Sequence, residues 1–179
     1  MNYQYTADLS VLSIRKLEWA LRDYQKQRAD KVARALDILA QKGVTVAKQM
    51  ADQSGTFGKA VVFEKTVPQI QGMQVSAIMR GVDLGIDMSW QQKDGTVKTE
   101  RVNALMMLEF GSGRYADSGH RGTFNPESPH AFDPNGWYFK PVNSNQWVHS
   151  YGYKPKQPML KAFLEMEKEV QSAFEEAYG

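Results

Sequence analysis

The sequence predicts an α+β protein, in which an antiparallel sheet of about four to five strands packs with a long or broken N-terminal helix and a C-terminal amphipathic helix. Three observations predict this class. Apolar residues recur at helical spacing in residues 8–53 and again in residues 158–178. Between residues 60 and 90 they alternate with polar residues or form β-branched runs, as half-buried strands do. Asp94-Gly95 then supplies a strong hairpin-turn signal. All 179 residues are expected to form a single domain.

The N-terminal region, residues 1–53, carries two apolar stripes separated by the polar stretch DYQKQRADK. Asp8 or Ser10 is placed to cap the start of the helix. The polar stretch allows one long helix that projects from the core or two consecutive helices, and two helices are the preferred interpretation. The stripes have the spacing of a one-sided helix and consist of Leu12, Leu17, Leu21 and Tyr24, then Val32, Leu36, Leu39, Ala40, Ala47 and Met50.

The sheet region, residues 54–113, begins with a glycine-containing loop and continues with three strand-like stretches. These are AVVFEKTV, MQVSAIMR and VDLGIDMSW, and Arg80-Gly81 is expected to turn the chain between the last two. The segment RVNALMMLEFGSG, residues 101–113, is either a short helix that Gly111 ends or a further strand.

Residues 114–153 form a long segment with little periodicity but many aromatic side chains. This composition is unlike that of a disordered linker, because disordered segments are poor in aromatic residues. GWYFKPV and QWVHSYG are expected to pair as a hairpin across Asn143-Ser144-Asn145. Residues 116–136, which precede this hairpin, are expected to be the most mobile part of the chain.

The last helix is expected at residues 158–178, and Pro158 is well placed in its first turn, where a missing N–H costs nothing. Lys154, Pro155 and Lys156 make the approach to this helix stiff and basic. The helix is expected to bury one stripe against the sheet of its own chain, with burial against another copy as the alternative. That stripe is Met159, Phe163, Met166, Val170, Ala173 and Ala177.

The charge of the chain is nearly balanced overall but uneven along it. The formal net charge is +2. Residues 1–53 hold nine Lys and Arg against six Asp and Glu, whereas residues 159–179 hold two against five. This asymmetry suits end-to-end contacts between copies, although solvated helix faces are the commoner explanation. The chain has no cysteine, which excludes disulfides and cysteine-ligated metal sites and fits a reducing compartment. No signal peptide and no membrane-spanning run are predicted, so a soluble, cytoplasmic protein is expected.

Several residues resemble parts of catalytic or metal sites, but none has the spacing that such a site requires. The three histidines, with Asp117 and Asp133 nearby, could form a metal site, yet no two of them share a helical face. Ser112 and Ser118 lack the surroundings of a nucleophile elbow, and FGSGR is not a phosphate loop. Exposed or interfacial positions are the preferred interpretation of His120, His130 and His149.

Glu109 lies in an apolar stretch just before a glycine. A buried glutamate can act as a general acid or base. The preferred interpretation is structural, with the carboxylate accepting hydrogen bonds from the backbone N–H groups of the turn that follows. We therefore expect no catalytic residue, no metal site and no cofactor.

DNA binding is the remaining chemical alternative. RKLEWALRDYQKQRADKVAR is basic, and KPKQP is basic beside aromatic residues. Acidic residues interleave with the first run, and dedicated nucleic-acid-binding domains are usually far more basic. At most, we expect non-specific contact with passing DNA.

Three segments resemble a known family. LEFGSG (108–113), GWYF (136–139) and QWVHSYGYKPKQPMLKAFLEM (146–166) are similar, in this order, to the motifs of the phage tail-component family called gene-product-ten-like, after an HK-type siphophage. The resemblance covers roughly residues 30–179, and its specific motifs lie in the last seventy residues or so. It also favours the helical interpretation of residues 101–113.

The resemblance implies a virion structural protein of a tailed phage or prophage, which acts at the neck in tail completion or head–tail joining. A tail-terminator ring protein is the alternative. The implied partners are other neck and tail proteins (the connector or stopper, the tail terminator or the tail tube) and copies of the same chain in a ring. The residues expected to form the assembly interface are Glu109, Gly111, Gly113, Tyr115, Trp137, Tyr138, Trp147, His149, Tyr151, Lys154, Pro155, Lys156 and Pro158.

Overall fold

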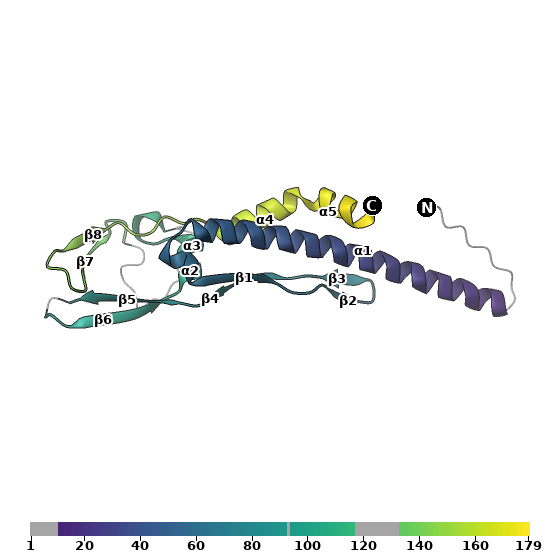
Figure 1. Ribbon diagram of the computed structural model, residues 1–179, viewed down its shortest axis with the longest axis horizontal. Helices are drawn as coiled ribbons and strands as arrows, with labels where there is room; N and C mark the ends of the chain where they lie inside the picture. Colours follow the sequence, from purple (N-terminus) through teal and green to yellow (C-terminus); the bar gives the residue numbers. More distant parts are fainter. Residues whose placement is uncertain (1–10, 93, 117–132) are drawn as a thin grey trace.

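A computed structural model describes residues 11–92, 94–116 and 133–179 of the chain. The expected caps Asp8 and Ser10, and most of the segment expected to be mobile, lie outside these residues. The α+β class is confirmed: a long N-terminal helix, C-terminal helices and antiparallel sheets make up the described part (Figure 1).

Helix α1 (Val11–Asp52) is continuous over 42 residues, or about 63 Å at ~1.5 Å per residue. The preferred interpretation of two consecutive helices is therefore wrong. The polar stretch stays helical because side chains four residues apart support one another: Arg22 pairs with Glu18 at 2.5 Å, and Gln27 donates to Asp23 at 2.8 Å. In Figure 1 the N-terminal part of α1 extends well beyond the other labelled elements.

A two-stranded sheet lies against the C-terminal half of α1, below it in Figure 1. Strand β1 (Val61–Lys65) pairs antiparallel with β4 (Met79–Asp83). The expected turn at Arg80-Gly81 is wrong, because Arg80 faces Glu64 and Gly81 faces Phe63 within this ladder. The chain leaves this ladder at Leu84-Gly85, where Gly85 has a φ of 70°, and continues into the next strand.

The stretch 73–80, expected as one strand, is divided between two small sheets. A short helix, α2 (Thr56–Lys59), precedes β1. Strands β2 (Gln69–Gln71) and β3 (Gln74–Ser76) form a hairpin of their own, with Gly72 at a φ of 62° in its turn. The remainder of the stretch enters β4.

The largest sheet has four strands in the order β6-β5-β7-β8. Strands β5 (Ile86–Gln91) and β6 (Val97–Val102) meet at the predicted Asp94-Gly95 turn, where Gly95 has a φ of 87°. Strands β7 (Trp137–Pro141) and β8 (Val148–Ser150) form the second predicted hairpin, with Asn143 at a φ of 65°. Both hairpin predictions are confirmed. The sheet size is as expected, but the described residues contain two further small sheets.

Helix α3 (Ala104–Phe110) confirms the helical alternative for residues 101–113. The side chain of Asn103 caps it by accepting from Met106 N at 2.8 Å, and Asp83 accepts from Ala104 N at 2.7 Å. Gly111, at a φ of 72°, ends the helix as predicted. A single 3₁₀ turn, η1 (Gly113–Tyr115), follows.

The C-terminal segment is helical but interrupted. Helix α4 (Pro158–Lys168) and helix α5 (Val170–Tyr178) are separated at Glu169, and Pro158 lies in the first turn of α4 as predicted. The expected stripe is only partly buried, since Phe163 is 58% exposed and Val170 is 43% exposed. The helices pack mainly on α1 and not on the sheet as expected: Ala173 of the stripe and Ala162 outside it are fully buried, because small side chains let these helices approach α1 closely.

The core lies where α1, β1, α3 and α4 meet. Its largest fully buried side chains are Phe63, Leu108 and Pro158. Gly43 of α1 lies directly under the side chains of Met79 and Met166, so the helix can approach both β4 and α4. None of the helices in the described residues is long and apolar enough to span a membrane.

Candidate functional site

The three motif segments meet at one junction. Ser112, which is 2% exposed, lies beside the segment 151–153. Ser112 N donates to Tyr153 O at 2.9 Å, and Tyr153 N donates to Ser112 Oγ at 2.9 Å. Arg114 N donates to Tyr151 O at 2.8 Å. The FGSG and YGY stretches are therefore bound to each other backbone to backbone, although about forty residues separate them in the sequence.

Glycine is required on both sides of this junction. Gly113 and Gly152 have φ values of 58° and 104°, where side chains are rarely tolerated. A Cβ atom on Gly152 would overlap the carbonyl oxygen of Ser112, and one on Gly113 would lie 2.5 Å from that of Tyr151. The ring of Trp137 also packs on Gly113. The glycines of the motif thus permit close contact between backbones.

Residues 154–157, which lead into α4, are hydrogen-bonded to the C-terminal part of α3. Lys156 N and Gln157 N both donate to Leu108 O, at 2.8 and 3.0 Å. Gln157 adopts a left-handed conformation with a φ of 56°, and Pro158 behind it is fully buried. Pro155 packs against Gly111. These prolines therefore hold α4 against its own chain.

Glu109 binds the N-terminus of α4. Its Oε2 accepts from Met159 N at 2.9 Å and its Oε1 from Leu160 N at 3.0 Å. The N-cap residue Gln157 makes no side-chain cap of its own, so Glu109 performs that role from a distant helix. The expectation that Glu109 accepts backbone hydrogen bonds is confirmed. The expected donors were wrong, since they lie fifty residues on and not in the following turn.

The outer side of the junction carries a row of stacked side chains, which we call the aromatic ladder: Tyr138, His149, Tyr151 and Arg114. Tyr138 and His149 stack with ring centroids 4.3 Å apart, and Tyr151 meets His149 edge-on at 4.4 Å. The guanidinium of Arg114 lies 5.0 Å from the centre of the Tyr151 ring. Asn135 O lies 3.0 Å from His149 Nε2 and so fixes the imidazole.

The ladder is open to solvent. Tyr138 is 68% exposed and Tyr151 is 46% exposed. Tyr115 and Trp147, two further residues of the predicted interface, are 42% and 49% exposed. Lys154 is also exposed, whereas Lys156 and Trp137 are half-buried.

The predicted interface residues therefore fall into two sets. One set forms the internal junction: Glu109, Gly111, Gly113, Trp137, Pro155, Lys156 and Pro158. The other set faces solvent or stacks at the surface: Tyr115, Tyr138, Trp147, His149, Tyr151 and Lys154. Sequence reasoning missed Arg114, because nothing in the sequence indicates that it reaches Tyr151.

The possible metal site is only partly described. His120, His130 and Asp117 lie outside the described residues, as does Ser118. The described residues contain no cluster of three or more His, Asp or Glu side chains that could hold a metal ion. His149, the one described histidine, is held in the aromatic ladder.

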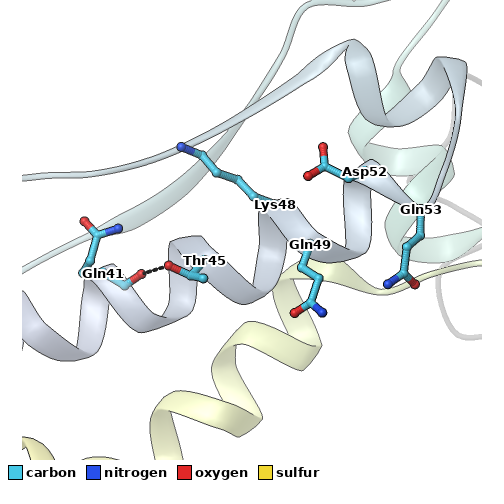
Figure 2. A pocket seen from close by; sticks show the side chains of 6 residues that line it. All are labelled: Gln41, Thr45, Lys48, Gln49, Asp52 and Gln53. Atoms are coloured by element: carbon cyan, nitrogen blue, oxygen red, sulfur yellow. Dashed lines mark hydrogen bonds between the residues drawn. The ribbon is translucent and has the colours of Figure 1, made fainter.

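A second candidate is a surface depression along the C-terminal half of α1. Figure 2 shows its six lining side chains, five from α1 and Gln53 from the turn just after it, and they do not converge on a common point. Thr45 Oγ1 donates to Gln41 O at 2.9 Å, and Asp52 is the only carboxylate among the six. Lys48 and Asp52 are the only ionisable side chains of this lining, and Figure 2 shows no hydrogen bond between them.

Comparisons with protein-family models, with curated proteins and with solved structures found no match.

Proposed function

We propose that this chain is a structural protein of the virion of a tailed phage or prophage, acting at the neck in tail completion or head–tail joining. It is made in the host cytoplasm and works by binding other proteins, without catalysis. The observation that carries the proposal is the aromatic ladder: stacked, solvent-exposed rings on a rigid, internally bonded support.

The composition of the ladder supports a role in protein binding. Tyrosine, tryptophan and arginine are enriched in the energetically dominant centres of protein interfaces. In the single chain Tyr138 is 68% exposed and Trp147 is 49% exposed. Each ring would therefore bury a large apolar area when a partner docks. Contiguous exposed apolar surface of this kind is typical of a site that another protein covers.

The support beneath the ladder favours docking without rearrangement. Tyr151 is fixed through its carbonyl by Arg114 N, and its neighbour Gly152 is packed against Ser112. A surface that is already ordered loses less conformational entropy when a partner binds. The motif segments that resemble the tail-component family all contribute to this support, which is why the resemblance and the geometry favour the same function.

The partners follow from this role. We propose that the ladder and the exposed Lys154 contact another neck or tail protein, such as the connector or stopper, the tail terminator or the tail tube. Copies of the chain would form a ring at that position. Contact of Lys154 with the DNA that passes through the neck is compatible with this placement but supplies no sequence recognition.

Complementation of a phage that lacks this gene tests the proposal. The double variant Tyr138→Ser and Tyr151→Ser removes two rings of the ladder but no buried contact, so the protein should still fold. We expect DNA-filled heads and complete tails that fail to join, seen by electron microscopy, together with a loss of infectious titre.

Met73→Ser is the matched control, since Met73 is an apolar side chain that is 85% exposed on a different hairpin. It should restore the titre as the wild type does. If the double variant also gave normal titres, the ladder would not be an assembly surface. Tails of uncontrolled length would assign the tail-terminator role instead.

A further inference from the structure

The N-terminal part of α1 projects from the molecule and carries several solvent-exposed apolar side chains. We call residues 12–28 the arm, because Ala29 is the first buried residue of this helix. Ile14 is 50% exposed and Leu21 is 46% exposed, Leu17 is half-buried, and Trp19, on another side of the helix, is 66% exposed. Figure 1 shows the arm extending past the C-terminal helices and past both small sheets.

One side of the arm has the spacing of a helix-packing seam. Ile14, Leu17 and Leu21 step by three and four residues, so they lie along one side. Leu12 lies on another side, because two residues correspond to a rotation of about 200° from Ile14. The spacing of the seam is typical of a helix that packs in a groove or against a second helix.

A matching apolar groove lies elsewhere on the molecule. It has a volume of about 320 Å³ and is formed between α1, β4 and α4. Its wall includes Leu39, Met79, Phe163 and Val170, with Glu167 at its border. Helix α4 therefore has two apolar sides: one packs on α1 through the fully buried Ala162, and the other presents Phe163. A helix that is apolar on two sides usually has a partner on both.

The arm cannot fill the groove of its own chain. Leu36, which lines the groove, belongs to the same continuous helix and lies twelve residues beyond Tyr24. That separation is about 18 Å along the helix axis. The arm would have to break α1 to fold back, so its seam can enter only the groove of another molecule.

The distribution of charged residues indicates that this other molecule is a second copy of the chain. The arm holds five Lys and Arg against two Asp and Glu, whereas residues 158–178, which comprise α4, Glu169 and α5, hold two against five. Arg15 and Lys16 have no carboxylate partner, and Glu167 no basic one, among the described residues. The pairing of Lys42 with Glu169 already joins α1 to the acidic helices within one chain. Two arms placed together would repel, but an arm beside α4 and α5 of another copy would be attracted.

We propose that the arm of one copy binds in the groove of a second copy, with Ile14, Leu17 and Leu21 against Phe163 and its neighbours. This contact is head-to-tail, so each molecule still has a free groove or arm, and the series either closes into a ring or continues. The contact rests on the proposed function only where it is taken to build the neck ring. The association itself is a property of the isolated protein.

A mixing experiment with two variants tests this arrangement. The arm variant, Ile14→Glu with Leu21→Glu, keeps its groove intact. The groove variant, Phe163→Glu, keeps its arm intact, and because Phe163 is largely exposed the fold should tolerate the change. Circular dichroism confirms that each is folded, and Val170→Glu replaces the groove variant if it is not.

Sedimentation velocity then gives the masses. We expect the wild type to form oligomers larger than dimers and each variant alone to be monomeric, with association weakened by roughly a hundredfold or more. An equimolar mixture should give a dimer of one variant with the other and nothing larger. The control Leu12→Glu, on a different side of the arm, should associate as the wild type does.

The remaining outcomes overturn the proposal. A wild-type protein that stays monomeric would mean that something other than a second copy covers the arm. Variants that still associate, or a mixture that stays monomeric, would exclude this contact. None of these results bears on the ladder variants in the complementation assay, so the two proposals can fail separately.

Discussion

Replacing Glu109 tests whether the junction depends on one carboxylate. In Glu109→Ala, the N–H groups of Met159 and Leu160 lose their acceptors, and the first turn of α4 has no other side-chain cap. The N–H of Met159 is partly buried, so water replaces its acceptor poorly, whereas the N–H of Leu160 is exposed and can be solvated.

The magnitude follows from these two bonds. Loss of a helix N-cap costs about 0.5–2 kcal/mol, and a hydrogen bond to a charged group contributes about 1.5–3 kcal/mol. With one of the two N–H groups open to solvent, we expect Glu109→Ala to lower the free energy of unfolding by about 2 kcal/mol. Glu109→Gln keeps an acceptor oxygen but loses the charge, so it should cost about half as much.

Urea denaturation followed by circular dichroism measures the effect. At a denaturant dependence of about 2 kcal/mol per molar urea, the midpoint of Glu109→Ala should fall by about 1 M. Glu167→Ala is the control, since it removes an exposed carboxylate of α4 and should stay within about 0.5 kcal/mol of the wild type. An unchanged midpoint for Glu109→Ala would refute the reasoning, because the cap would then carry no energy.

Three further predictions concern the same scaffold. Gly152→Ala should lower the free energy of unfolding by about 3 kcal/mol or more in urea denaturation, since its φ is 104° and a Cβ would overlap Ser112 O; a loss below about 1 kcal/mol would contradict the close contact. The hydroxyl of Tyr153 is buried without a hydrogen-bond partner in the described residues, so Tyr153→Phe should raise stability by about 1 kcal/mol, and a clear loss would indicate a hidden partner. The hydrogen bond from Lys42 and that from a serine hydroxyl lower the pKa of Glu169 below its ordinary 4.5. The stability that Glu169 contributes should therefore be present above pH 4.5 and be lost as pH falls through the lowered pKa; a wild-type advantage over Glu169→Gln that persisted at lower pH would contradict this.

Local signals predicted the parts of the fold that local geometry decides. Asp94-Gly95 and Gly111 act within a few residues of themselves, and each ends or turns an element as expected. Pro158 likewise begins its helix. The class of the fold follows from periodicity, which is also a local property.

Pairings between distant segments could not be predicted in this way. Arg80-Gly81 resembles a turn, but a strand continues through it because Phe63 and Glu64 of a distant strand lie opposite. Glu109 was expected to bind its own turn, and its true donors are fifty residues away. Such contacts depend on which segments meet in three dimensions, and residue type alone does not specify that.

The candidate site also combines features that local sequence signals predicted with features that depend on contacts between distant segments. Its aromatic composition was evident in the sequence, and so was the hairpin that carries Tyr138 and His149. The stacking order of those rings and the position of Arg114 were not, because they result from the junction of Ser112 with residues 151–153. The sequence also gave no reason to separate the residues that build the support from those that face a partner.

The most direct measurement is cryo-electron microscopy of the purified virions of a phage that encodes this chain. The proposed function predicts density for several copies at the head–tail junction, with Tyr138 and Tyr151 buried against a different neck or tail protein. Virions that contain no copy of the chain, or copies whose aromatic ladder faces solvent in the finished particle, would contradict it.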